Sequence, residues 1–284
     1  MQIGKFHLTR LREMVASEGL GLFPGLETPD LNDPRIVSAP FFDPVGDLFL
    51  TSIHLWVIRG EGKVILLDAG AGAGKDRPMS PRFHNLPGDL NRLLAPAGIG
   101  PEDVTDVVIT HCHVDHIGWC TINGPQGPVP AFPGIPHHIP GANLDALAPS
   151  AAPAGRDPRW NNPWDDSIAP LLEAGLVRRI GPGAQIGPLE AIAADGHTPG
   201  QMAYRLRDGG QGVLFAADAL HHPVQILNPD LNSRYCSDPQ TARATRRRLL
   251  TLAADEGLRL LPAHFDSDTG AEIFRTQEGG FDFR

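Results

Sequence analysis

Two neighbouring segments in the first third of the chain have the hydrophobic pattern of adjacent β-strands. Ser52–Ile58 and Lys63–Asp68 are rich in valine, isoleucine and leucine, and the short turn Arg59–Gly62 separates them. The second segment runs directly into a tight glycine turn, Ala69–Gly72. The pattern predicts a β-hairpin whose second strand ends at this glycine turn.

Similar patterns continue toward the C-terminus and predict alternating strands and helices. The predicted helices are Leu90–Ala97 and Pro239–Glu256, and a short turn is expected at Pro101–Val104. The predicted strands are Asp106–Thr110, Leu189–Ala194, Met202–Arg207, Val213–Ala217 and Arg259–Leu261, the last continuing through Pro262 to His264. Because strands alternate with helices without a break in composition, we expect one α/β domain over residues 1–284, with two packed sheets and outer helices.

The middle of the chain, around residues 125–170, differs from the segments on either side. It is rich in proline, glycine and alanine, and it contains Trp160 and Trp164. Prolines and glycines interrupt regular elements, so only part of this stretch is expected to be helical. We interpret it as an insertion into the domain that forms one wall of a pocket.

The composition is that of an ordinary globular protein, with 41% hydrophobic and 20% charged residues. No apolar run approaches the roughly 20 residues that a membrane span requires. The first residues, Met1–Lys5, have no apolar stretch of the signal-peptide type, although removal of a leader would leave the same sequence. The three cysteines, Cys112, Cys120 and Cys236, form no C-x-x-C pair. These features predict a cytoplasmic protein without a membrane segment.

The net charge of −9 argues against a nucleic-acid partner, because lysine and arginine side chains drive phosphate binding. The one basic cluster, Arg243 with Arg246–Arg248, lies in the predicted helix and is expected to be a solvated helix face. We therefore expect a small-molecule substrate as the partner. Association of two copies of the chain as a homodimer is the second partner that we consider.

The strongest chemical signal is the cluster His111-Cys112-His113-Val114-Asp115-His116. His111 and His113 are two residues apart, so both side chains point the same way in an extended segment. Asp115 and His116 require the chain to turn, which aims them at a second point nearby. Imidazole and carboxylate are ligands that suit zinc, iron, manganese or cobalt. Since one metal ion requires only three of these ligands, the surplus predicts two ions.

Three further candidate ligands lie where a predicted strand gives way to a loop. His197 lies in a glycine- and proline-rich turn, Asp218 follows the strand Val213–Ala217, and His264 closes the last strand. Rigid strand ends are suitable supports for side chains that must hold a fixed geometry. Together with the histidine cluster, these residues predict a seven-ligand site.

The order of these motifs resembles that of the metallo-β-lactamase superfamily over most of the chain, from about Thr51 to His264. The resemblance rests on Leu66–Gly72, the H-x-H-x-D-H cluster, Gly196–Gly200, Asp218 and His264. It implies an αββα sandwich of two mixed β-sheets packed face to face, with helices outside and the site at one edge of the sheets.

The resemblance also implies a role for each ligand. His111, His113 and His197 would hold the first metal, while Asp115, His116 and His264 would hold the second, and Asp218 would bridge both. Asp68 would orient ligands without binding metal, with capping of the glycine turn as the alternative. We expect two divalent ions, with zinc as the first choice and manganese, cobalt or iron as alternatives.

Within the superfamily, the sequence looks most like the methyl-parathion-hydrolase and lactonase-like branch. Pro101–Val104, His221 and the arginine-rich segment of the predicted helix carry this resemblance. Acyl-homoserine lactonases usually have a tyrosine three residues after the bridging aspartate, where this chain has His221. The difference favours a broader esterase or organophosphate (phosphotriester) hydrolase over a dedicated lactonase, and the expected substrate is a small ester, lactone or phosphotriester.

The expected mechanism is attack by a metal-bridging hydroxide, since bound metal lowers the pKa of water toward about 7. Asp115 is the candidate for moving the proton to the leaving group. His221, or alternatively His222, is the candidate donor of a hydrogen bond to the substrate. Cys112 is expected to be a buried filler and not a ligand.

A mainly apolar pocket and a neutral or lipophilic ester are expected. The expected lining residues are Phe41, Phe42, Trp56, Trp119, Trp160 and Trp164. The alternative functions are a β-lactam hydrolase, a dinuclear iron redox enzyme and a non-catalytic metal-binding protein.

Overall fold

A computed structural model gives the fold of the chain, and it describes residues 1–149 and 163–284. The described helices are α1 (Leu90–Leu94), α2 (Val114–Ile117), α3 (Gly141–Leu147), α4 (Ala169–Glu173), α5 (Val224–Leu227) and α6 (Pro239–Glu256). The described strands are β1 (Gln2–Ile3), β2 (Phe6–Gly19), β3 (Phe42–Asp43), β4 (Leu48–Gly60), β5 (Lys63–Leu67), β6 (Asp106–Val108), β7 (Thr121–Gly124), β8 (Gly127–Pro130), β9 (His137–Pro140), β10 (Val177–Ile180), β11 (Gln185–Ile186), β12 (Leu189–Ala193), β13 (Met202–Asp208), β14 (Gln211–Ala217), β15 (Arg259–Pro262), β16 (Ala271–Arg275) and β17 (Phe281–Phe283).

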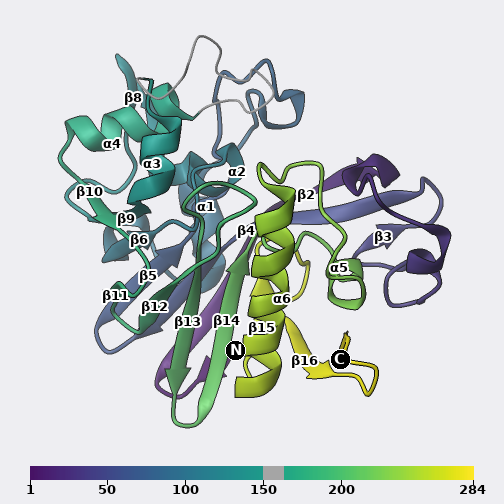
Figure 1. The fold of residues 1–284 in the computed structure, drawn as a ribbon. Coiled ribbons are helices and arrows are strands. Elements are labelled where there is room, and N and C mark those ends of the chain that lie inside the picture. Colours follow the sequence, from purple (N-terminus) through teal and green to yellow (C-terminus); the bar gives the residue numbers. More distant parts are fainter. Residues whose placement is uncertain (150–162) are drawn as a thin grey trace.

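The strands form two large mixed sheets and a separate hairpin. The first sheet has the order β1-β2-β4-β5-β6-β9-β10, with β3 paired to β4. The second sheet runs β11-β12-β13-β14-β15-β16-β17, and β7 pairs with β8 alone. Figure 1 shows α6 lying across β14 and β15, while α3 and α4 lie beside the other sheet. The αββα sandwich predicted from the sequence is confirmed.

The alternation of side chains along each strand explains why the two sheets pack face to face. Trp56 of β4 and Phe215 of β14 meet between the sheets, with ring centroids 5.7 Å apart. Their chain neighbours point the opposite way: Leu55 packs in the cluster that contains residues of α1, and Leu214 packs with Leu249 of α6. Each sheet therefore buries one face against the other sheet and one against helices.

The sequence pattern predicted the central strands better than the edges. The strand predicted at Ser52–Ile58 is the longer β4, the predicted strand Asp106–Thr110 ends at Val108, and the predicted helix Leu90–Ala97 ends as a 3-10 turn. The N-terminal strand β2 was not predicted, because charged side chains such as Arg10 and Arg12 interrupt its apolar pattern; both bind Asp266 across the fold. The strands β9, β10, β16 and β17 were also not predicted.

The middle segment is partly helical, as predicted, but it also supplies a strand to the sheet core. The described part of the segment contains α3 and α4, and β9 pairs in parallel with both β6 and β10. Trp160, which we expected in a pocket wall, lies outside the described residues.

The interpretation of the arginine cluster as a solvated helix face is wrong for Arg246. This side chain is completely buried and donates hydrogen bonds of 2.7 Å to the carbonyl oxygens of Ala219 and Pro229. Its neighbour Arg247 is exposed and binds Asp230, as expected for a helix face. A guanidinium carries five N–H donors, so it can satisfy several carbonyls of buried loops at once.

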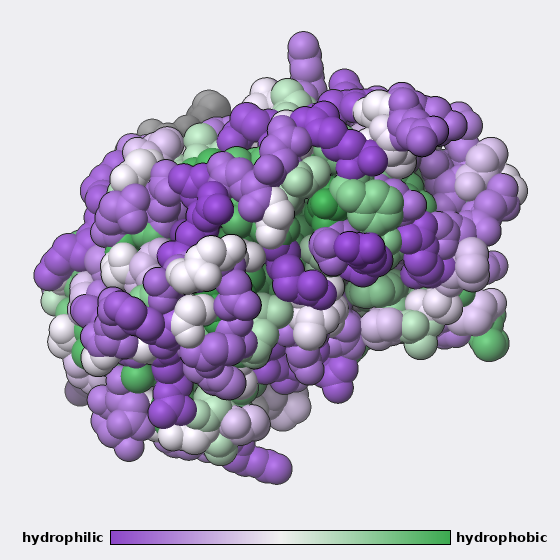
Figure 2. Space-filling view, turned by 90° about the horizontal axis from the view of Figure 1, so that it is seen from below, coloured by the Kyte–Doolittle hydropathy of each residue, from purple (hydrophilic) through white to green (hydrophobic). Residues whose placement is uncertain are grey.

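Hydrophilic residues cover most of the molecular face shown in Figure 2, and hydrophobic residues form small separate groups on it. Among the helices of the described ranges, none is both long and apolar enough to cross a membrane.

Candidate metal centre

The histidine cluster lies directly after a central strand of the first sheet. β6 ends at Val108, and the chain continues as a loop that carries His111 and His113 into α2. Asp115 and His116 lie on α2, so the helical turn gives them a direction different from the two preceding histidines.

The other three candidate ligands come from the second sheet. His197 lies in the turn between β12 and β13, Asp218 follows β14, and His264 follows β15. β14 and β15 are parallel neighbours, so their carboxyl ends reach the same edge of the sheet. The seven residues predicted from the sequence therefore meet at one edge of the sandwich.

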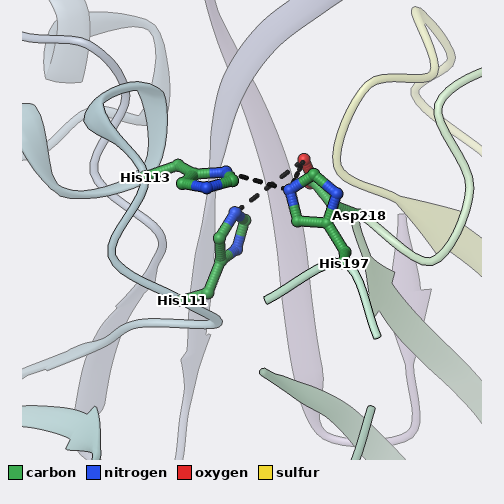
Figure 3. A group of neighbouring side chains, drawn as sticks. All are labelled: His111, His113, His197 and Asp218. Carbon is green, nitrogen blue, oxygen red and sulfur yellow. Dashed lines mark hydrogen bonds and ion pairs between the residues drawn. The ribbon is translucent and has the colours of Figure 1, made fainter. Parts of the chain in front are cut away.

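Four of these side chains converge on one point. Atoms of His111, His113, His197 and Asp218 that could each hold a metal ion lie within 4.8 Å of one another. Nε2 of His197 lies 2.9 Å from Nδ1 of His113 and 3.3 Å from Oδ2 of Asp218. Figure 3 shows the four side chains pointing toward one another from two sides. Ligand atoms that share one zinc ion lie about 3–4 Å apart, because each lies roughly 2 Å from the ion.

A second group of three ligands lies beside the first. Nε2 of His116 and Nε2 of His264 lie 3.8 and 3.9 Å from the carboxylate oxygens of Asp115. Asp218 lies between the two groups, since Oδ2 is 3.3 Å from His197 Nε2 of the first group and Oδ1 is 3.3 Å from His116 Nε2 of the second. The carboxylate is therefore placed to contact cations in both groups.

The protonation states of the first ligand group also suit cation binding. Burial lowers the pKa of both His111 and His197 well below the ordinary value, so their rings are neutral and keep a lone pair for a metal. Burial opposes ionisation of Asp218, but His264 and His116 outweigh it and hold the pKa of this carboxyl well below its usual range.

Several buried polar atoms of the cluster have no hydrogen-bond partner among the described residues. They include Nε2 of His111, Nε2 of His116 and Oδ1 of Asp218. A buried polar atom without a partner is costly, and a bound cation would remove that cost for all three. The donor set and these orphaned atoms fit a pair of divalent metal ions.

Comparison with known proteins agrees with this geometry. A sequence profile of the metallo-beta-lactamase superfamily matches residues 49–264, which include all seven candidate ligands. The chain belongs to the metallo-beta-lactamase superfamily. A sequence comparison with curated proteins finds no match.

Several solved structures share this fold at low sequence identity. The hydrolase AbOPH is 22% identical with a TM-score of 0.82, and the match covers 100% of this chain and 95% of that one. AidC, a dizinc quorum-quenching lactonase in complex with a product N-hexanoyl-L-homoserine, is 22% identical with a TM-score of 0.77 and the same coverage. A probable metal-dependent hydrolase from Staphylococcus aureus is 17% identical with a TM-score of 0.79, covering 100% and 99% of the two chains.

Asp68 belongs to neither ligand group, but it holds the ligand loop and His116 in place. Its carboxylate accepts hydrogen bonds from the backbone N–H of Thr110 at 2.8 Å, from the Thr110 hydroxyl at 2.9 Å and from Nδ1 of His116 at 2.9 Å. The side chain of Asp68 thus binds the ligand loop. It does not cap the glycine turn Ala69–Gly72, which was the alternative expectation.

The residue that holds the glycine turn is Glu13, which sequence reasoning missed. Its carboxylate accepts from the N–H groups of Ala71 and Gly72 at 2.6 and 3.1 Å and from the Trp119 indole at 2.7 Å. The turn packs closely on the end of α2, where a Cβ at Gly118 would lie only 1.9 Å from the Ala71 carbonyl oxygen. Only glycine permits this approach, which fixes α2 and its ligands.

Asn143 of α3 connects two ligand loops and was also missed. Its Oδ1 accepts from the backbone N–H of Cys112 at 2.7 Å, and its Nδ2 donates to the carbonyl of Pro199 at 2.8 Å. The side chain thus joins the His111 loop to the His197 turn. Cys112 itself is fully buried in an apolar cluster and in no ligand group, as expected for a filler.

The structure separates the two candidate substrate-contacting histidines. His221 lines the cavity above the ligands, and its Nε2 lies 3.3 Å from Oδ2 of Asp218. It also forms a third group with Asp218 and His264 that could hold a metal ion, which the sequence did not suggest. His222 is wrong as a cavity residue, because its ring packs against Phe41 and Phe49, and burial lowers its pKa to about 3.

The cavity has a volume of about 540 Å³, and the prediction that it is lined by Phe41, Phe42, Trp56, Trp119 and Trp164 is wrong. Phe42, Trp56, Trp119 and Trp164 pack in hydrophobic clusters, and Phe41 packs against the cluster that contains Phe42. The observed lining residues are Glu18, Leu22, Thr51, Ile53, Met79, Ser80, Pro81, Arg82, Phe83, His113, Val114, Asp115, His197, Asp218, His221, Arg234, Tyr235 and His264. The walls thus combine aliphatic and polar side chains with the aromatic rings of Phe83 and Tyr235, and two arginines contribute to them.

Proposed function

We propose that this chain is a dinuclear metal-dependent hydrolase that cleaves a small ester or lactone, with phosphotriesters as the second substrate class. The observation that carries the proposal is the position of the ligands: His113, Asp115, His197, Asp218 and His264 all line one cavity large enough for a small molecule. A site that only stabilised the fold would not need access from such a cavity.

The proposed ligand assignment follows the two groups of side chains. His111, His113 and His197 would hold one ion, Asp115, His116 and His264 the other, and Asp218 would bridge them. Such a pair of divalent ions lowers the pKa of water and polarises a carbonyl or phosphoryl oxygen. We propose zinc as the resident metal, which is supported by the dizinc site named for AidC.

Asp115 is the proposed proton carrier. Its side chain lines the cavity and keeps 15% of its surface exposed, whereas the Asp218 side chain keeps 3%. A carboxylate at this position can accept a proton from the attacking water and deliver it to the leaving oxygen.

His221 is the proposed hydrogen-bond donor to the substrate. Burial lowers its pKa below the ordinary value, so the ring is neutral at neutral pH and carries one N–H. This N–H can stabilise negative charge that develops on the substrate oxygen.

The test is a substrate panel assayed after reconstitution with zinc, manganese, cobalt or iron. We expect hydrolysis of 4-nitrophenyl esters or lactones, loss of activity with a chelator, and recovery with zinc. Hydrolysis of β-lactams alone would support the alternative β-lactamase activity. A visible absorption spectrum of an iron centre in protein from defined medium would support the redox alternative. No turnover of any ester, lactone or phosphotriester with any metal would refute the proposal.

A further inference from the structure

One wall of the cavity contains charged residues that the proposed hydrolysis does not use. Glu18 at the end of β2, Arg82 of the loop before α1 and Arg234 of the loop before α6 all line it, together with Tyr235. Arg82 and Arg234 lie 64 and 216 residues from Glu18 in the sequence. None of these residues belongs to a metal-ligand group.

Glu18 fixes both arginines at the cavity. Its carboxylate, only 5% exposed, accepts hydrogen bonds from Arg82 Nη1, from Arg234 Nη2 at 3.1 Å and from the Tyr235 hydroxyl at 2.5 Å. Arg234 also lies over the Tyr235 ring, with Cζ 4.9 Å from the ring centroid. Both guanidinium groups are therefore held in place before any ligand arrives, which lowers the entropy lost on binding.

The arginines keep unused donors and solvent access. The hydrogen bonds of the Arg82 side chain within the described residues use Nη1 alone, and those of Arg234 use Nη2 alone. Each guanidinium has five N–H donors, so most of them are available. The Arg82 and Arg234 side chains are 31% and 49% exposed.

The charges in this wall do not balance. Two guanidinium groups face one carboxylate, and burial raises the pKa of Tyr235, which keeps that hydroxyl neutral. The wall thus has a net charge of +1 in a chain whose net charge is −9. A single negative charge on a ligand would neutralise it, whereas a doubly charged phosphate would not.

We propose that Arg82 and Arg234 bind a carboxylate of the substrate, remote from the bond that is cleaved. The substrate class is then an ester or lactone with one carboxylate on a short apolar chain, which Ile53, Phe83 and Val114 of the same cavity would contact. The identity of the cleaved bond, an ester or lactone, rests on the proposed hydrolase function, whereas the carboxylate-binding site does not. The assignment replaces the neutral ester expected from the net charge.

A matched pair of esters tests the proposal: 4-nitrophenyl hydrogen glutarate and its methyl ester, which differ only in the charge of the distal group. We expect the zinc-loaded protein to favour the anion in kcat/KM. Arg82→Gln and Arg234→Gln should each lower the ratio of the two kcat/KM values about tenfold, mainly through the KM of the anion, because a charge-assisted hydrogen bond is lost. Arg234→Lys should keep part of the preference.

Glu18→Gln separates anion binding from a structural role. Glutamine keeps one side-chain oxygen that can still accept from the arginines, and it removes the competing negative charge. The preference for the anion should therefore increase, whereas a purely structural role of Glu18 predicts that the preference falls. Arg247→Gln is the control, because Arg247 is an exposed arginine that binds Asp230 outside the cavity. The ratio of kcat/KM for the anion to kcat/KM for the methyl ester should be the same in Arg247→Gln as in the parent protein.

Binding of glutaric acid mono-anilide, measured by titration calorimetry on the zinc-loaded protein, gives a readout that does not require hydrolysis. Weaker binding in Arg234→Gln and Arg82→Gln supports the anion site, even if neither ester is cleaved, in which case only the hydrolase proposal fails. Equal binding in the parent and both variants would overturn the anion site, because the carboxylate would then sit on the metal ions. Equal kcat/KM values of the parent protein for the methyl ester and the anion would also overturn the anion site.

Discussion

Nδ1 of His116 donates a hydrogen bond of 2.9 Å to Oδ2 of Asp68. A carboxylate only accepts hydrogen bonds, so Nδ1 carries a proton, and Nε2 is the nitrogen left to offer a lone pair when the ring binds a metal as neutral imidazole. Nε2 is the atom that lies 3.3 Å from Asp218 and close to the Asp115 carboxylate. Asp68 thus decides which nitrogen of His116 faces the metal centre.

Asp68→Asn should weaken metal binding. An asparagine offers one oxygen in place of two and turns an NH2 group toward Thr110 or His116, so one hydrogen bond to the ligand loop is lost. We expect the affinity for the ion held by His116 to fall roughly 10–100-fold. Competition with a chromophoric chelator measures this affinity. Asp106→Asn is the control, since Asp106 is a carboxylate of the same sheet that binds Lys63 and His138, and it should leave metal affinity unchanged.

Asp218→Ala should abolish hydrolysis, because Asp218 contacts histidines of both ligand groups. Loss of a residue that only orients a metal ligand can lower activity roughly 100-fold. We expect kcat to fall by more than that in Asp218→Ala. Steady-state kinetics with metal quantified in the same sample provides the measurement. Asp208→Ala, on the hairpin at the other end of β13, should keep parental kcat. Near-parental kcat in Asp218→Ala would refute the bridging role.

Arg246→Met should destabilise the fold much more than Arg247→Met. Removing the buried guanidinium leaves the carbonyls of Ala219 and Pro229 without their donors, at about 1–3 kcal/mol each. The exposed pair of Arg247 with Asp230 is worth about 0–1 kcal/mol. Urea unfolding of both variants measures the difference, and equal losses would contradict the role assigned to Arg246.

Lys75 should make stability depend on alkaline pH. Its ammonium group is buried against Thr121 and the carbonyl of Asp166, and burial lowers its pKa from 10.5 to about 8. Below pH 8 both folded and unfolded chains carry the charge, so the folded state bears the full cost of burying it. Between pH 8 and 10.5 the unfolded chain binds more protons, and the contribution of Lys75 to the free energy of unfolding rises with pH.

Lys75→Met removes this titration. The unfolding free energy of the variant minus that of the parent should therefore fall with rising pH between 8 and 10.5. Other groups that titrate in this range cancel in the difference. A difference that stays constant across the range would show that Lys75 is not buried in its charged form.

Much of the centre was predictable because its signals are local. The spacing of His111, His113, Asp115 and His116 within six residues is visible in the chain, and so are the apolar runs of β5, β6 and β14 that hold the ligand loops. A ligand at the end of a buried strand needs no knowledge of its distant partners. The aromatic pocket lining failed because hydrophobicity alone does not distinguish a cavity wall from a core.

The sequence by itself determined which side chains can bind metal and which segments alternate between two buried faces. Only the tertiary structure decided that His116 is the ligand that Asp68 contacts, that Asn143 joins two ligand loops, and that Glu18 gathers arginines from distant loops at the cavity. The physical reason is that residue type and periodicity encode contacts between near neighbours. Hydrogen bonds between residues tens to hundreds of positions apart exist only after the two sheets have packed.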